Sequence, residues 1–174
     1  MKHINIEIKA KCFHLQKVEA FLVANNAIFK GTDLQKDTYF HVPDGRLKLR
    51  QGNIENNLIY YKRDDNKGPK QSDFYLVPVP KAAEMVALLT DALGIKVIVE
   101  KKRKIFYLGN IKVHIDEVPR LGCFVEIEAG NLLQPDISAE ELHKQCTNLM
   151  QHFGIQEEHL IENSYSDMLL SKEC

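Results

Sequence analysis

Alternation of apolar and polar residues with period two dominates this chain. In residues 2–11, KHINIEIKAK, Ile4, Ile6 and Ile8 lie on one face of a strand, and polar or charged side chains lie on the other. The same alternation predicts further strands at residues 35–42, 46–51, 58–63, 73–79, 96–108, 111–118 and 122–130. The pattern therefore predicts about eight strands.

Helical spacing is confined to a few segments. Apolar residues recur three or four positions apart at residues 14–25, 80–92 and 138–154. In the last of these, Ser138 is a suitable N-cap, Glu141 stands at the capping-box position and Gly154 is a suitable stop. The tail at 164–171 has room for one or two further helical turns.

Turn residues join the strands directly. PDG at 43–45 and GN at 109–110 are turn signals between alternating runs, and few helices separate the strands. The predicted fold class is therefore α+β: an antiparallel sheet or barrel of about eight strands with flanking helices. A doubly wound parallel sheet would alternate strands with helices throughout.

Composition narrows the class of protein. The 174 residues suit a single domain, and 23 basic against 24 acidic residues give no global reason to expect binding to nucleic acid or membrane. No apolar run approaches the roughly 18 residues of a membrane span, and the first residues lack the apolar core of a signal peptide. The four cysteines form no CxxC pair. A cytoplasmic location is expected.

Several strands gather charges of one sign on one face. The residues in these rows are Arg46, Lys48 and Arg50, Lys101 and Arg103, and Glu126 and Glu128. A solvated face of an antiparallel sheet is the ordinary explanation, but like charges two positions apart repel one another. A bound polyanion would neutralise the cations, and a divalent cation would neutralise the carboxylates. Closing the sheet into a barrel would turn these rows into a charged tunnel, with helices covering its aliphatic outside.

A series of segments resembles the CYTH superfamily, the triphosphate tunnel enzymes that include class IV adenylyl cyclases and thiamine triphosphatases. The segments, in family order, are NIEIK at 5–9, DTYFHVPDGRLKLR at 37–50, IYYKRDDNKGPKQSD at 59–73, VEKKR at 99–103, HIDEVPRLGCFVEIE at 114–128 and SYSDMLL at 164–170. Residues 60–74 are most similar to class IV adenylyl cyclases. The resemblance implies one CYTH-like domain over residues 1–174, folded as a barrel around a triphosphate tunnel.

The resemblance also implies roles for individual residues. The cations implied to bind phosphate are Lys9, Arg46, Lys48, Arg50, Arg63, Lys70, Lys101 and Arg103. Among these cations, Lys9, Arg63, Lys101 and Arg103 are also expected to act in catalysis. The carboxylates implied to hold Mg²⁺ or Mn²⁺ are Glu7, Asp116, Glu126 and Glu128.

One position departs from the family pattern. Asn5 stands where the ExExK signature has its first glutamate. Its amide oxygen can ligate a hard cation but brings no charge, so one metal position is weakened or the substrate preference is altered. The departure bears on cyclase activity in particular.

Three functions follow as alternatives. The leading expectation is a metal-dependent cyclase of the class IV type, which converts ATP to cyclic AMP and pyrophosphate. The second is a triphosphatase acting on thiamine triphosphate, a nucleoside triphosphate or tripolyphosphate, and the third is a polyphosphate- or nucleotide-binding module without turnover. The expected partner is a small-molecule triphosphate, not nucleic acid or membrane, and family resemblance alone suggests a homodimer.

Other chemical signals are weaker. His114 and Asp116 form an HxD pair on one face, but a single histidine is slight evidence for a zinc site. The phosphate-binding loop GxxxxGK[ST] is absent from the sequence. The basic run EKKRK at 100–104 alternates in parity, which favours a strand over a nucleic-acid patch.

Overall fold

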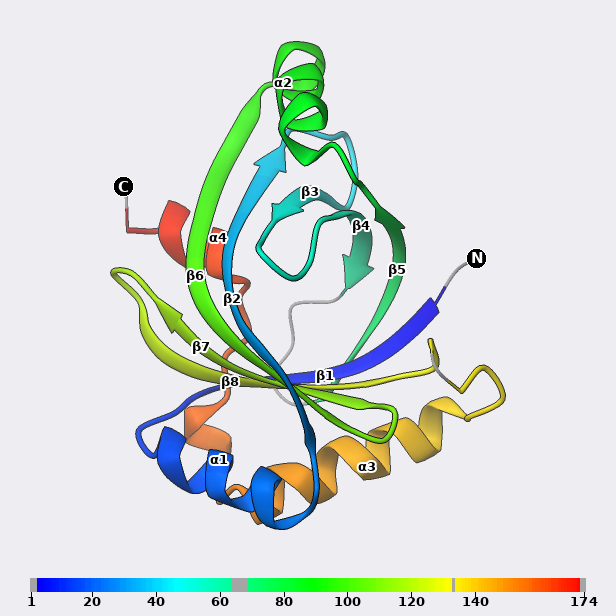
Figure 1. Ribbon diagram of the computed structural model, residues 1–174, viewed down its shortest axis with the longest axis vertical. Coiled ribbons are helices and arrows are strands. Elements are labelled where there is room, and N and C mark those ends of the chain that lie inside the picture. Colours follow the sequence, from blue (N-terminus) through cyan, green and yellow to red (C-terminus); the bar gives the residue numbers. More distant parts are fainter. Residues whose placement is uncertain (1–2, 64–68, 133, 173–174) are drawn as a thin grey trace.

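A closed, eight-stranded antiparallel barrel forms the body of the protein (Figure 1). The computed structural model describes residues 3–63, 69–132 and 134–172. The strands are β1 (His3–Lys11), β2 (Ile28–Phe40), β3 (Arg46–Gln51), β4 (Asn57–Arg63), β5 (Lys70–Pro78), β6 (Ile95–Leu108), β7 (Ile111–Val118) and β8 (Gly122–Gly130). They follow one another around the barrel in the order β1-β5-β4-β3-β2-β6-β7-β8. The predicted α+β barrel is confirmed.

The helices lie outside the barrel wall or across its end. They are α1 (Leu15–Ala24), α2 (Ala82–Leu93), α3 (Ala139–His152), the short 3₁₀ turn η1 (Glu157–His159) and α4 (Tyr165–Leu170). Figure 1 shows α1 and α3 together beneath the barrel and α2 at the opposite end. Ser138 caps α3 by accepting the Glu141 N–H, as its sequence predicts. No helix of the described chain is long and apolar enough to cross a membrane.

Two strands begin several residues earlier than the alternation predicts. β2 starts at Ile28 instead of residue 35, because a register shift at Phe29 and Gly31 interrupts the two-residue period there. Gly31 adopts φ +128°, which favours glycine. β5 starts at Lys70 instead of residue 73, within a polar stretch that has no apolar alternation. Pairing with neighbouring strands, not local pattern, sets both starting points.

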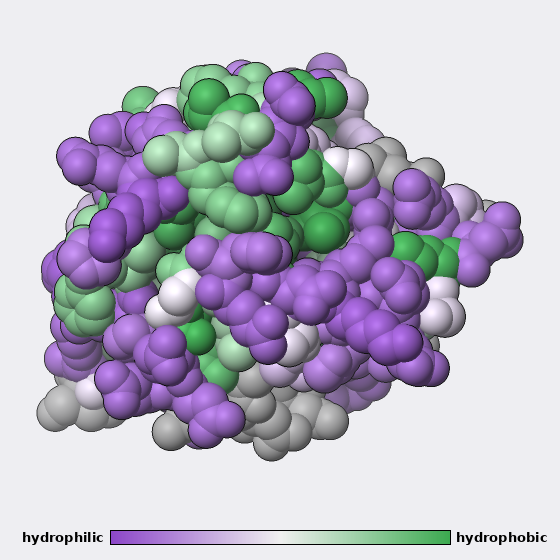
Figure 2. All heavy atoms as spheres, turned by 90° about the horizontal axis from the view of Figure 1, so that it is seen from below, coloured by the Kyte–Doolittle hydropathy of each residue, from purple (hydrophilic) through white to green (hydrophobic). Residues whose placement is uncertain are grey.

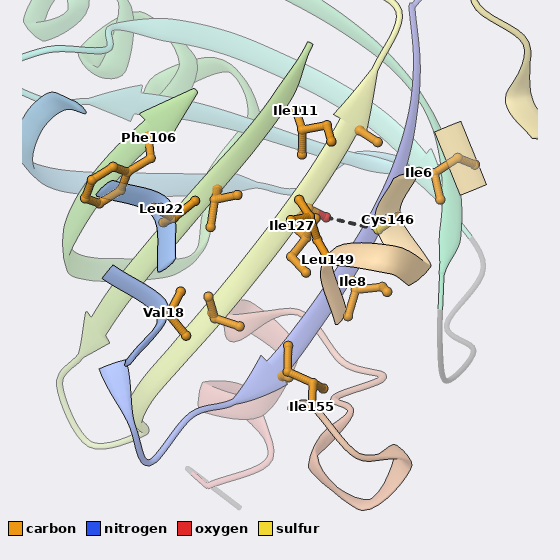
Figure 3. Close-up of a cluster of buried hydrophobic side chains, with 14 of the residues drawn as sticks. Ile6, Ile8, Val18, Leu22, Phe106, Ile111, Ile127, Cys146, Leu149 and Ile155 are labelled. Atoms are coloured by element: carbon orange, nitrogen blue, oxygen red, sulfur yellow. Dashed lines mark hydrogen bonds between the residues drawn. The ribbon is translucent and has the colours of Figure 1, made fainter. Parts of the chain in front are cut away.

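The main aliphatic core lies outside the barrel, between its wall and the helices α1 and α3 (Figure 3). The outward side chains of β1, β7 and β8, such as Ile8, Val113 and Ile127, are fully buried under the helices. Leu22 of α1 and Leu142 of α3 pack against this wall. Burial of apolar area stabilises a fold by about 25 cal/mol per Å². The shell therefore stabilises the barrel without filling its interior.

Smaller cores close other parts of the barrel. Tyr165 and Leu169 of α4 pack against Val99 and Phe124 at one end of the interior, and Ala82 of α2 packs with a separate group over β2 and β3. Viewed from beneath, where α1 and α3 lie, the surface is mostly hydrophilic around a hydrophobic patch (Figure 2).

Candidate functional site

A cavity of about 120 Å³ lies inside the barrel and is lined mainly by charged side chains. All eight strands, the turn between β3 and β4, and the start of α4 contribute to it. The charged lining residues are Glu7, Lys9, Asp37, Lys48, Arg50, Glu55, Lys101, Arg103, Lys112, Glu126 and Glu128. The interior that a soluble barrel ordinarily fills with apolar side chains is here an ionic chamber.

Strand register explains why these side chains meet. Side chains alternate between faces of a strand, and directly opposed residues on neighbouring strands share a face. β1 and β8 place Lys9 opposite Glu126 and Glu7 opposite Glu128, and β7 places Lys112 opposite Glu128. Because their outward neighbours are aliphatic and covered by helices, these charged residues face the cavity.

Asp37 is the centre of a cationic cluster. Its carboxylate accepts hydrogen bonds from Lys48 Nζ at 3.1 Å, Arg50 Nε at 2.9 Å and Lys101 Nζ at 2.7 Å. Burial alone would raise the pKa of Asp37, but Arg50, Lys101 and Lys48 hold it well below its usual value. Burial lowers the pKa of Lys101 to about 7, with neighbouring cations adding to the effect and Asp37 opposing it. Three cations thus share one internal anion.

Arg103 joins a second network with carboxylates from β7 and β8. Its guanidinium donates to Asp116 Oδ1 at 2.7 Å and also contacts Glu126, which pairs with Lys9 at 3.0 Å. Tyr165 of α4 donates its hydroxyl to Asp116 at 2.8 Å, and Lys9 Nζ lies 4.0 Å from the centre of the Tyr165 ring. The C-terminal helix therefore supports this side of the cavity.

The turn between β3 and β4 carries a further anion into the cavity. Glu55 pairs with Arg50 at 2.9 Å and with Lys112 at 2.5 Å. Buried Asp33 holds the turn by accepting the backbone N–H groups of Ile54 and Glu55 at 2.8 and 3.0 Å. Although burial alone would raise it, the pKa of Glu55 is lowered, since Arg50 and Lys112 flank the carboxylate. Glu55 is thus an internal partner for two cations.

Carboxylates suited to a divalent cation lie on the opposite wall. Donor atoms of His114, Glu126 and Glu128 all lie within 4.8 Å of one another, and Glu7 faces Glu128 from β1. Burial would raise the pKa of Glu128, but His114 and Lys112 lower it to about 2. Carboxylate oxygens are the ligands that Mg²⁺ and Mn²⁺ accept. This donor set fits the expected metal.

The structure brings most of the predicted site residues together. Those lining the cavity are Glu7, Lys9, Lys48, Arg50, Lys101, Arg103, Glu126 and Glu128. Arg46 instead pairs with Asp167 of α4 at 3.0 Å, and Asp116 lies beneath Arg103, fully buried, outside the cavity lining. The side chains of Arg63 and Lys70 fall outside the described part of the structure.

The sequence pattern did not identify several lining residues, namely Asp37, Glu55, Lys112 and Tyr165. Lys112 shares the parity of His114 and Asp116, so alternation carried a signal for it. Glu55 lies in a turn and Tyr165 in the tail, where no period indicates direction. The sequence led us to expect that a bound polyanion and a divalent cation neutralise the charge rows. Within the described structure, the rows instead form ion pairs with one another across strands.

Comparison with known proteins places the fold. The CYTH domain model matches residues 3–165. The PH1012 protein of Pyrococcus horikoshii is 22% identical, with 94% of this chain and 98% of that chain covered and a TM-score of 0.78. A proposed adenylate cyclase of Vibrio parahaemolyticus is 17% identical, with coverage of 96% and 98% and a TM-score of 0.75. No curated protein matches the sequence.

A third solved structure connects two activities. It is described as a proposed adenylyl cyclase of Hippeastrum that has a dominant triphosphatase activity. It is 13% identical to this chain, with coverage of 98% and 95% and a TM-score of 0.62. These structures share the fold, and the family model covers nearly the whole sequence. The chain therefore belongs to the CYTH domain family.

Proposed function

We propose that this protein is a divalent-metal-dependent triphosphatase that holds its substrate inside the barrel. Members of the CYTH family are cyclases or triphosphatases, and both act on triphosphates. The observation that carries the proposal is that the carboxylates Glu7, Glu126 and Glu128 and the cations around Asp37 face one cavity. A phosphate chain bound with a metal ion is the ligand that needs both sets.

The cations supply electrostatic stabilisation. Lys48, Arg50 and Lys101 surround one end of the chamber, where they can hold phosphate oxygens and stabilise charge that develops on the leaving group. A divalent cation, held by Glu126, Glu128 and Glu7, would offset charge on the phosphate chain. On binding, substrate phosphates would replace Asp37 and Glu55 as the partners of these cations.

Cavity size favours hydrolysis of a compact substrate. Pockets that enclose drug-sized ligands have volumes of about 300–1,000 Å³. The cavity of about 120 Å³ is smaller than these pockets and has the size to hold part of a phosphate chain. Water can enter such a site and attack a terminal phosphate, whereas cyclisation requires an ordered ribose hydroxyl at the α-phosphate.

A cyclase is the second candidate, because part of the same cavity is apolar. Ile59, Tyr61, Phe74 and Leu76 of β4 and β5 line it opposite the carboxylates. Such a wall could receive a base or ribose. In that case the 3′-hydroxyl would attack the α-phosphate and release pyrophosphate, which is the leading expectation from the sequence.

Product analysis tests the proposal. The protein is incubated with Mg²⁺ or Mn²⁺ and with ATP, thiamine triphosphate or tripolyphosphate in separate reactions. We expect orthophosphate, with loss of activity in Lys101→Met and full activity in Lys102→Met, whose outward lysine pairs with exposed Glu117. If ATP instead gave cyclic AMP and pyrophosphate, the protein would be a cyclase, the second candidate. Tight binding without any product would overturn both enzymatic candidates and indicate a binding module.

A further inference from the structure

His114 is a buried imidazole that lies beside two carboxylates without a hydrogen bond to either. It lies on β7 with no solvent exposure, between Ile105 of β6 and Glu126 of β8. Neither ring nitrogen makes a hydrogen bond within the described structure. Its Nδ1 lies 3.5 Å from a Glu126 oxygen and 3.4 Å from a Glu128 oxygen. Since buried polar atoms without partners oppose folding, this position needs another explanation.

The spacing around His114 is that of ligands on one metal ion. Around an octahedral ion with ligands at about 2.1–2.2 Å, adjacent donor atoms are about 3 Å apart and opposite ones about 4.3 Å apart. The donor atoms of His114, Glu126 and Glu128 lie within 4.8 Å of one another before any adjustment to an ion. Small side-chain shifts would bring all three to bonding distance.

We propose that His114 supplies a nitrogen ligand to this site, and that the site consequently prefers a first-row transition-metal dication such as Mn²⁺ over Mg²⁺. Mg²⁺ binds oxygen donors almost exclusively, whereas imidazole is a good ligand for transition metals. The inference rests on the proposed metal-dependent function and specifies which metals the same site takes. It also gives the Nδ1 atom of His114 a bonded partner.

Spectroscopy on the parent protein provides a direct test. Electron spin echo modulation is recorded on the Mn²⁺-loaded protein, with natural and ¹⁵N-labelled histidine. We expect a histidine nitrogen coupling that changes with the label. Bound Mn²⁺ without such a coupling would overturn the inference, and this result needs no variant that folds.

Competition between metals provides a second test with a matched control. The Mg²⁺ concentration that displaces Mn²⁺ is measured for the parent, for His114→Gln, and for His143→Gln on the exposed side of α3. We expect the preference for Mn²⁺ to fall about tenfold or more in His114→Gln and to be unchanged in the control. An unchanged preference in a folded His114→Gln protein would overturn the inference while leaving triphosphate hydrolysis standing. If neither ion binds, the metal-dependent function fails as well.

Discussion

The two faces of the barrel wall are built from opposite chemistry. On β8, Val125 and Ile127 point outward and are fully buried beneath the helices, whereas Glu126 and Glu128 point inward to the cavity. The outer shell is aliphatic and non-directional. The interior is a set of ion pairs, each with specific partners. One strand supplies both because its side chains alternate.

The difference separates stability from function. Apolar burial in the shell stabilises the fold whether or not a ligand is present. Buried ion pairs recover little more than their desolvation cost, but removal of one partner is strongly unfavourable. The interior pairs therefore add little to the net stability of the fold. Their main effect is to keep cations and carboxylates ordered for a ligand that can replace some of their partners.

The largest effect is expected from Asp37→Asn. This change leaves Lys48, Arg50 and Lys101 close together without their shared anion. We expect the free energy of unfolding, measured by urea denaturation, to fall by about 3–5 kcal/mol. Tripolyphosphate should restore much of this loss, because its charge replaces that of Asp37.

The control for Asp37→Asn is Glu117→Gln, which removes the exposed partner of Lys102 and should leave stability unchanged. If Asp37→Asn were as stable as the parent, or if tripolyphosphate stabilised both proteins equally, the cations would not depend on an exchangeable anion.

The next effect concerns the shell. Leu142 of α3 is buried against the outer wall, so Leu142→Ala leaves a cavity there. We expect a loss of about 3 kcal/mol in the free energy of unfolding. Tripolyphosphate should stabilise this variant by the same amount as the parent, in contrast to Asp37→Asn. A selective rescue of Leu142→Ala would mean that shell and interior are not separate.

Sequence alternation predicted the direction of side chains better than their depth. Arg46, Lys48 and Arg50 share one parity, yet Arg46 lies toward the end closed by α4 and pairs with Asp167. Asp116 likewise has the predicted inward direction but lies beneath Arg103. Parity determines the face of a strand, whereas position along the barrel axis depends on strand tilt and register, which a single strand does not encode.

Residues outside the strands were beyond the reach of periodicity. Glu55 enters the cavity because Asp33, on another strand, holds its turn. Tyr165 enters because the tail folds back onto the barrel. Both placements depend on tertiary contacts between distant segments. The barrel and most of its charged lining could be predicted from sequence, while the ends of the cavity could not.

A moderate effect of pH is expected through Lys101, whose pKa is about 7 in the folded protein and about 10.4 in an unfolded chain. Below pH 7 both states carry the proton. Between pH 7 and about 10 the unfolded chain binds more protons, so this group's contribution makes stability rise with pH across that window.

Ligand binding should depend on the same proton in the opposite direction. A bound polyanion favours charged Lys101, so the affinity for tripolyphosphate should fall up to about tenfold per pH unit above 7. The affinity for tripolyphosphate is measured by calorimetry at pH 6, 7 and 8 for the parent and for Lys101→Met. Because the ligand titrates in the same way in both series, the difference between them reports on Lys101. Parallel pH profiles for the two proteins would show that Lys101 does not change protonation on binding.

The smallest effect is expected at Glu55, which occupies Arg50 and Lys112 before a ligand arrives. Glu55→Gln removes a competing negative charge, while Asp33 still holds the backbone of the turn. We expect tripolyphosphate to bind about threefold more tightly, equivalent to ~0.6 kcal/mol, as measured by calorimetry. Weaker binding would instead show that Glu55 positions the two cations for the ligand. An increase in affinity thus identifies Glu55 as an internal competitor, and a decrease identifies it as a positioning residue. Glu117→Gln again controls for a general change in charge.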